Sequence, residues 1–228
     1  MLKTITVLTT IFISITSYTQ DVTALVLKVK AKYNTVNDYE ANGRMKTNVI
    51  FIKAPIAKIK VWYKKPNKLR IKNESGISFI PKGSVNVNMG NVFALNNFQA
   101  LDAGTDKVNG VVVKVVKILP NDDGDIVLST LYIDEANLLV LKSKTSTKDN
   151  GSYELTMQYG DYASYGLPKK VDFQFNVKEY KLPKGVTFDY DNGANGDNAK
   201  KIKGKKGRIE ITYSSYTINK GINDTVFQ

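Results

Sequence analysis

The sequence predicts a mainly β protein in which a strongly curved antiparallel sheet, or unclosed β-barrel, is covered by one N-terminal amphipathic helix. Apolar residues recur with helical spacing only between about Asp21 and Tyr33, and from Tyr39 onward they alternate with polar residues at period two. Turn-forming segments at 121–125 and 149–151 separate neighbouring runs, as in antiparallel hairpins. No repeat of fixed period is present, which argues against a propeller or a solenoid. Many short strands with one helix favour a curved sheet.

The helix is predicted by a single apolar stripe. Its members follow the spacing i, i+3, i+4, i+7 and i+11, and they are Val22, Leu25, Val26, Val29 and Tyr33. Lys28, Lys30 and Lys32 lie off this stripe. A helix with one apolar face is expected to pack that face against the sheet.

The strands are predicted from alternation and from turn signals. They cover 39–49, 49–54, 57–64, 68–73, 77–80, 84–88, 91–95, 111–119, 126–133, 138–145, 152–159, 170–177 and 208–218, and the first two could be one bent strand. The segment 57–64 places Ile59, Val61 and Tyr63 on one face, and the other face is basic around Trp62. A Pro-Asn turn at 66–67 predicts that this strand forms a hairpin with the next.

The first 19 residues have the pattern of a signal peptide. Lys3 is followed by an apolar run from Ile5 to Ile15, and Ser17 and Thr19 have the spacing of a signal-peptidase site before Gln20. We therefore expect an exported chain with a signal peptide at 1–19 and a single domain at 20–228. With 42% hydrophobic residues, a chain of 228 residues can bury one sizeable core.

The composition removes several kinds of catalytic site. The chain has no histidine and no cysteine, which excludes His-based triads, thiolate nucleophiles and the usual zinc sites. The acidic segments 121–125 and 189–193 lack the later glutamate of a calcium loop and are interpreted as turns. We expect no enzyme, no cofactor and no metal. A hydrolase that uses two of the 21 acidic side chains stays open, because such pairs are close in space and not in sequence.

The net charge of +12 comes from two basic blocks. Residues 41–73 hold ten Lys and Arg without an acid, and residues 199–208 hold six without an acid. One interpretation is solvated strand faces that prevent edge aggregation. The other is attraction to an anionic surface, which for an exported chain would be a lipid headgroup rather than nucleic acid.

Taken in order, these features resemble the outer-membrane lipoprotein carrier (LolA-like) family. Trp62-Tyr63-Lys64-Lys65-Pro66-Asn67-Lys68-Leu69 is similar to that family's strand ending in Trp-x-Lys-Arg-Pro-Asn. Leu131-Tyr132-Ile133-Asp134 followed by 138–142 resembles its leucine-rich hairpin, and Asn150-Gly151-Ser152 before Tyr159-Gly160-Asp161-Tyr162 resembles the next one. The resemblance covers about residues 21–180 and depends on the order and spacing of these motifs.

The resemblance implies an unclosed barrel with a helical lid over an apolar cavity that holds acyl chains. It implies a periplasmic, monomeric carrier of lipoproteins or other lipids that exchanges cargo with membrane proteins of the envelope. The side chains expected at the cavity or lid are Leu25, Val29, Val61, Tyr63, Leu155, Met157, Phe173 and Phe175. Lys64 and Lys65 are expected to contact the lid or a partner. The alternative is a sensor or binding module of the same fold that docks a protein through its basic faces.

Two departures from the family pattern bear on these expectations. The family's arginine before proline, which helps to hold the lid shut, is Lys65 here, and a lysine lacks the planar fork of a guanidinium. The hairpin expected after the proline strand is replaced by Gly76-Ile77-Ser78-Phe79-Ile80-Pro81. The basic segment 199–208 has no counterpart in the family pattern.

Overall fold

The computed structural model describes residues 22–49, 52–53, 56–66, 68–74, 97–148, 151–176 and 206–227. They form one antiparallel sheet with the helix α1 (Val22–Tyr33) and the short 3-10 helices η1 (Ala163–Tyr165) and η3 (Asp224–Phe227). The strands are β1 (Asp38–Val49), β2 (Ile52–Lys53), β3 (Ala57–Lys64), β4 (Lys68–Asn73), β5 (Phe98–Val108), β6 (Val111–Pro120), β7 (Ile126–Asp134), β8 (Leu139–Thr147), β9 (Ser152–Tyr159), β10 (Pro168–Asn176) and β11 (Lys206–Ile218).

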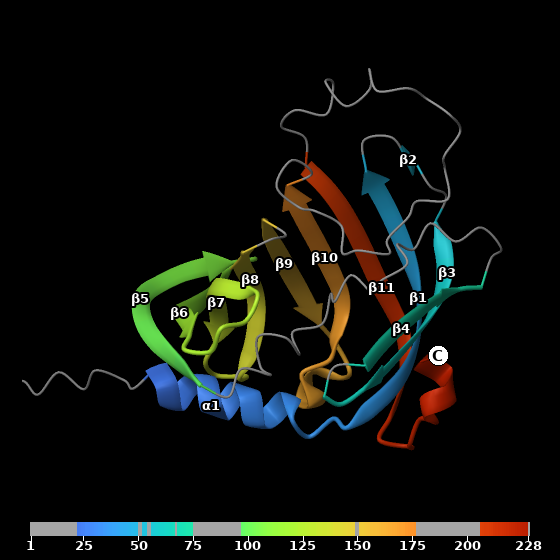
Figure 1. The fold of residues 1–228 in the computed structure, drawn as a ribbon, viewed down its shortest axis with the longest axis horizontal. Helices are drawn as coiled ribbons and strands as arrows, with labels where there is room; N and C mark the ends of the chain where they lie inside the picture. Colours follow the sequence, from blue (N-terminus) through green and yellow to red (C-terminus); the bar gives the residue numbers. More distant parts are fainter. Residues whose placement is uncertain are drawn as a thin grey trace, which may run out of the picture.

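The sheet is strongly curved and, over the described residues, open. Its strand order is β4-β3-β1-β11-β10-β9-β8-β7-β6-β5, with β2 paired to β1 beside this path. No pairing among the described strands joins β4 to β5, the two strands at the ends of this order. Figure 1 shows the strands curling around one side of the molecule, with β5 at one margin and β3 and β4 at the other. The predicted fold class is confirmed.

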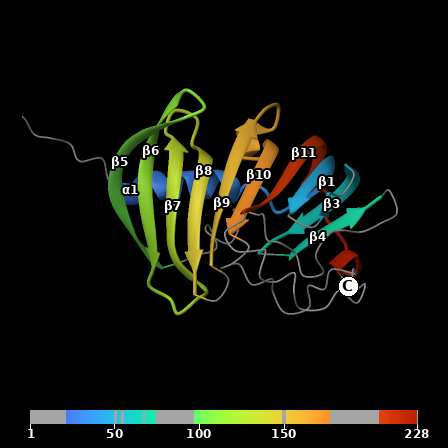
Figure 2. The ribbon, with the colours of Figure 1, turned by 90° about the horizontal axis from the view of Figure 1, so that it is seen from above.

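Helix α1 lies across the concave side of this sheet. Figure 2 shows it behind the strands from β5 towards β9, and it contacts β5 and η1. Its apolar stripe packs inward, because Val22, Leu25, Val26 and Val29 are all buried. The helix ends at Tyr33, and the short 34–37 connection turns the chain into β1. Among the described residues, no helix has the length and the apolar character needed to cross a membrane.

The hydrophobic core lies between α1 and the inner face of the sheet. The alternation in β3 is as predicted, since Ile59, Val61 and Tyr63 are buried, whereas Lys60 and Trp62 between them are only partly buried. Strand β4 pairs with β3 from Lys68 opposite Lys64 to Asn73 opposite Ile59, which confirms the hairpin around the Pro-Asn segment.

Strand β5 was not predicted from the sequence. It runs from Phe98 to Val108 but exposes most of its side chains, and it pairs only with β6 in the described sheet. Its polar middle contains Gly104 in a left-handed conformation where the register with β6 shifts, so it lacks the apolar alternation of a half-buried strand. The strands predicted at 77–80, 84–88 and 91–95 lie outside the described residues.

Candidate functional site

The residues predicted to line a cavity lie together in the interior. Leu25, Val29, Val61, Tyr63, Leu155, Met157, Phe173 and Phe175 all belong to one buried cluster formed by α1 and the inner face of the sheet. Leu155 of β9 lies opposite Phe173 of β10, and the rings of Phe173 and Phe175 are 5.3 Å apart. Val29 on α1 is fully buried and belongs to the same cluster. Side chains of the helix and of the sheet therefore pack together in the interior, where the sequence predicts a ligand.

A small cavity remains beneath the C-terminal end of α1. Its volume is about 50 Å³, which is room for about three water-sized groups. It is lined by Tyr33, Tyr39, Val61, Leu69, Ile71, Met157, Gly166, Leu167, Pro168, Val171, Tyr213 and Tyr216. Val61 and Met157 are the two predicted site residues in this lining. An acyl chain does not fit this space.

Tyrosine side chains dominate one side of the cavity. The rings of Tyr39, Tyr63, Tyr162, Tyr213 and Tyr216 form a connected group, which we call the tyrosine cluster, with centroids 5.0–5.3 Å apart along its contacts. Sequence reasoning missed this cluster as a site. The tyrosines come from β1, β3, β11 and the segment between β9 and β10, so they are far apart in the chain.

A β-bulge in β11 places two members of the tyrosine cluster on the same face. The pairing of β1 with β11 shifts between Asn42 and Gly43, which leaves Ser214 as an extra residue, and Tyr216 then joins Tyr213 on the inner face. A regular period of two would turn Tyr216 outward. Gly43 permits the close approach, because a Cβ atom there would lie 2.7 Å from the carbonyl oxygen of Thr212.

Three of the hydroxyl groups around the cavity have protein partners. The Tyr33 and Tyr159 hydroxyls are 2.5 Å apart, and Tyr159 also donates to the carbonyl oxygen of Val140 at 2.8 Å. Tyr216 donates to the carbonyl oxygen of Pro168 at 2.7 Å. Burial raises the pKa of Tyr33 to about 12. Its side chain therefore stays a neutral hydrogen-bond donor at physiological pH.

Burial also raises the pKa of the tyrosines in the cluster. The pKa of Tyr39 is well above its ordinary value, first because of burial and then because of repulsion from Tyr213 and Tyr63. Burial likewise raises the pKa values of Tyr213 and Tyr216. The cavity is therefore lined by neutral hydroxyl groups and apolar side chains.

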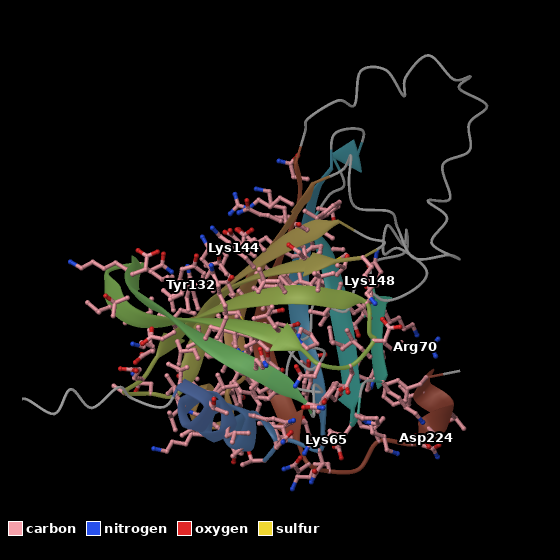
Figure 3. The ribbon with its side chains drawn as sticks, turned by 60° about the vertical axis from the view of Figure 1, so that its left-hand side comes forward. Lys65, Arg70, Tyr132, Lys144, Lys148 and Asp224 are labelled. Atoms are coloured by element: carbon pink, nitrogen blue, oxygen red, sulfur yellow. The ribbon has the colours of Figure 1, made fainter. Side chains whose placement is uncertain are left out.

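Polar contacts near the C-terminal end of α1 hold the helix against the sheet. The Lys65 ammonium group donates to the carbonyl oxygen of Asn34 at 2.5 Å and to Oδ1 of Asn37 at 3.2 Å. The Lys32 ammonium group on α1 donates to the carbonyl oxygen of Asn137 at 2.7 Å. Figure 3 shows Lys65 below the sheet, near the end of α1. Lys65 thus contacts the residues that follow the helix.

The side chain of Lys64 contacts the C-terminal segment and not the residues that follow α1. Its ammonium group donates to the carbonyl oxygen of Ile222 at 2.9 Å and to Asp224 at 2.8 Å. Lys68 also contacts Asp224, at 3.1 Å, and Arg70 donates to the carbonyl oxygen of Val226. Figure 3 shows Arg70 and Asp224 close together beside η3. The C-terminal segment therefore covers the basic end of the β3–β4 hairpin, and Lys64 and Lys65 have separate surroundings.

The remaining chemistry of the described residues offers no candidate metal centre. No group of three or more acidic, histidine or cysteine side chains comes together there in a way that could hold a metal ion. The carboxylates on the outer face mostly pair with lysine or arginine, as Glu154 does with Lys142 at 2.9 Å and Glu210 with Lys170 at 2.9 Å.

Comparison with solved structures identifies the fold. The chain is similar to a domain from Vibrio parahaemolyticus whose name describes it as an outer membrane lipoprotein-sorting protein domain. The two are 13% identical, the match covers 90% of this chain and 94% of that chain, and the TM-score is 0.55. A DUF1329 family protein from Desulfovibrio piger gives 13% identity, 90% and 95% coverage and a TM-score of 0.53. A LolA superfamily protein from Nitrosomonas europaea gives 8% identity, 89% and 96% coverage and a TM-score of 0.53.

No protein-family model and no curated protein matches the sequence. At sequence identities of 8–13% the structural likeness establishes only the fold, so the function must be argued from the site. The LolA-like fold that the sequence motifs imply is confirmed.

Proposed function

We propose that this chain is a non-enzymatic periplasmic carrier that binds the acyl chains of lipoproteins or other lipids and transfers them towards the outer membrane. The observation that carries the proposal is the apolar interior of the curved sheet, against which one helix packs its apolar face. The name of the Vibrio parahaemolyticus neighbour, a lipoprotein-sorting domain, supports the same function. In this proposal α1 is the lid, and the cargo takes its place against the sheet.

The helix α1 and an acyl chain would gain comparable free energies from burial in the apolar interior. Four side chains of α1 are buried, and at about 2 kcal/mol for each buried Val or Leu they contribute about 8 kcal/mol. An acyl chain gains about 0.8 kcal/mol for each methylene removed from water, so about ten methylenes match the helix. A longer chain therefore displaces the lid, and the lid closes again when the chain leaves. This balance suits a carrier that must also release its cargo.

The polar contacts of the lid make the exchange reversible. Lys65 and Lys32 hold α1 through hydrogen bonds to backbone carbonyl groups at the edge of the interior, where water can replace them. Such exposed contacts each contribute only about 1 kcal/mol or less. They orient the closed helix without preventing its opening.

Ligand retention tests the proposal. Protein purified from the cell envelope should carry lipid or lipoprotein in native mass spectrometry, and the delipidated protein should bind a fluorescent acyl probe. Excess long-chain acyl ester should displace that probe, whereas an alkyl chain of four carbons should not. Protein that purifies without lipid and binds no acyl probe would refute the carrier function.

The proposal also includes export and processing of the chain. We propose that the signal peptide is removed near Thr19 and Gln20 and that residues 20–228 act as a monomer that exchanges cargo with envelope membrane proteins. Amino-terminal sequencing of the exported protein and its mass in solution test these two statements. A mature chain that begins elsewhere, or a stable dimer, would contradict them.

A second function, docking of an anionic partner by the outer face, is favoured by like charges in register. Arg44 of β1 lies opposite Lys58 of β3, and Lys60 of β3 lies opposite Lys72 of β4. Like charges directly opposite in a sheet are destabilising. Glu40 compensates Lys60 at 2.7 Å, and an anionic partner would add to this compensation along the same face. If this face docks a partner, Arg44→Gln with Lys72→Gln should abolish partner capture and leave lipid retention unchanged. Loss of lipid retention in that variant would contradict a separate docking face.

A further inference from the structure

We propose that Tyr39 and Tyr213 form a subsite that binds a neutral oxygen acceptor of the cargo, such as the carbonyl of an ester or an amide. The proposal rests on the carrier function above and names the part of the cargo that the tyrosine cavity recognises. The acyl chain would lie in the interior, and its carbonyl group would lie in the cavity beneath the end of α1.

The two hydroxyl groups are available for a ligand. Tyr33, Tyr159 and Tyr216 have hydrogen-bond partners within the protein, whereas over the described residues no partner is present for the hydroxyls of Tyr39 and Tyr213. The side chain of Tyr39 is only 7% exposed, and buried hydroxyl groups almost always have a partner. An unoccupied donor in this place indicates a site for an acceptor.

Tyr39 and Tyr213 both line the cavity, and neither hydroxyl group is fully enclosed. Every fully enclosed side-chain nitrogen or oxygen among the described residues has a hydrogen-bond partner. The hydroxyl oxygens of Tyr39 and Tyr213 lack one, so they are not fully enclosed, and both residues line the 50 Å³ cavity. A carbonyl oxygen has two lone pairs and can accept from both donors.

The lining selects an acceptor without charge. Among the described residues that line the cavity there is no lysine, arginine or acidic side chain. A carboxylate or phosphate buried there would lose its hydration without gaining a counter-ion, which is strongly unfavourable. The tyrosines stay protonated because burial raises the pKa of each. Two neutral donors in an apolar setting suit an ester or amide carbonyl and reject a free fatty acid.

The cavity also lies where a chain could continue from the carbonyl. Val61 and Met157 belong both to its lining and to the buried cluster against which α1 packs. A ligand whose carbonyl reached the tyrosines could therefore extend its chain along the surface that α1 covers. Hydrophobic contact would supply the affinity, and the tyrosines would supply the discrimination between lipid classes.

The experiment compares three ligands of the same chain length as competitors of a fluorescent acyl probe: methyl palmitate, hexadecane and sodium palmitate. The native protein should prefer methyl palmitate to each of the others by about tenfold, as expected for one or two hydrogen bonds. The variant Tyr39→Phe/Tyr213→Phe should lose most of this preference and retain its affinity for hexadecane. Each single variant should lose part of it, which provides a test if the double variant does not fold.

Tyr216→Phe is the matched control. It removes a hydroxyl from the same lining, but one that already donates to Pro168, so the preference for the ester should stay. Equal affinity of the native protein for ester and hydrocarbon would overturn the subsite, as expected if the hydroxyls only hold water. An unchanged preference in the variants would overturn it as well. Failure of all three ligands to bind would instead refute the carrier function itself.

Discussion

Replacement of Lys65 tests whether α1 is a lid that opens. Its ammonium group makes two hydrogen bonds to the residues that follow the helix, at 2.5 and 3.2 Å, and the side chain is half-buried. A hydrogen bond to a charged group contributes about 1.5–3 kcal/mol when buried, and solvent screening reduces the pair here to about 1 kcal/mol. Lys65→Ala should therefore increase the open population about fivefold, since 1.4 kcal/mol corresponds to a factor of ten.

Hydrogen exchange and ligand affinity measure the same equilibrium. Amides of residues 22–33 in Lys65→Ala should exchange about fivefold faster, whereas amides of β9 and β10 should not change. Apparent affinity for an acyl probe should rise by the same factor, because only the open state binds. Lys65→Arg should exchange more slowly than Lys65→Ala, since it keeps a charged donor at this position. Unchanged exchange in the helix, or faster exchange everywhere, would refute the lid mechanism.

Three further predictions concern the interior. Leu25→Asp should detach α1 and lower the melting temperature, because Leu25 is 4% exposed in the core, and Leu27→Asp on the same helix should have little effect because Leu27 is 50% exposed. Gly207→Ala should destabilise the fold by about 1–3 kcal/mol in urea unfolding, because its Cβ would overlap the ring of Phe175, whereas Gly124→Ala, which meets no atom, should be neutral. The tyrosines that line the cavity have raised pKa values, so their contribution to stability is complete below pH 10. Above pH 10 the unfolded chain loses phenolic protons that the folded chain keeps, and the free energy of unfolding should fall by about 1.4 kcal/mol per pH unit for each such tyrosine.

The sequence was most informative where one face of an element is apolar and the other is polar. The stripe that begins at Val22 predicted α1 to within one residue, and the alternation around Val61 predicted β3 and its hairpin with β4. In both cases burial of one face determines the residue types: at every second position in the strand, and at every third or fourth position in the helix. Strand β5 was missed because it is exposed on most of its length, so no apolar pattern marks it.

The tyrosine cavity was missed for a different reason. Tyr213 and Tyr216 have an odd spacing, which in a regular strand would place them on opposite faces. The bulge that brings them together depends on the pairing of β11 with β1, two strands at opposite ends of the chain. Pairing between such distant segments leaves no periodic pattern in the sequence from which the bulge could be predicted. The absence of room for a Cβ at Gly43 is visible only once the two strands are in contact.

The bulge also divides the interior into two chemically different parts. On the β9–β10 side, Leu155 and Phe173 offer a surface without hydrogen-bonding groups, where only the length of an apolar chain matters. On the β1–β11 side, Tyr39 and Tyr213 offer hydroxyl donors, where the chemistry of the attached group matters. Because α1 ends beside the second part, the proposed lid opening and the proposed recognition of the polar group would occur at adjacent places. A cargo with both features gains free energy from the whole interior, whereas a plain hydrocarbon gains it from one part alone.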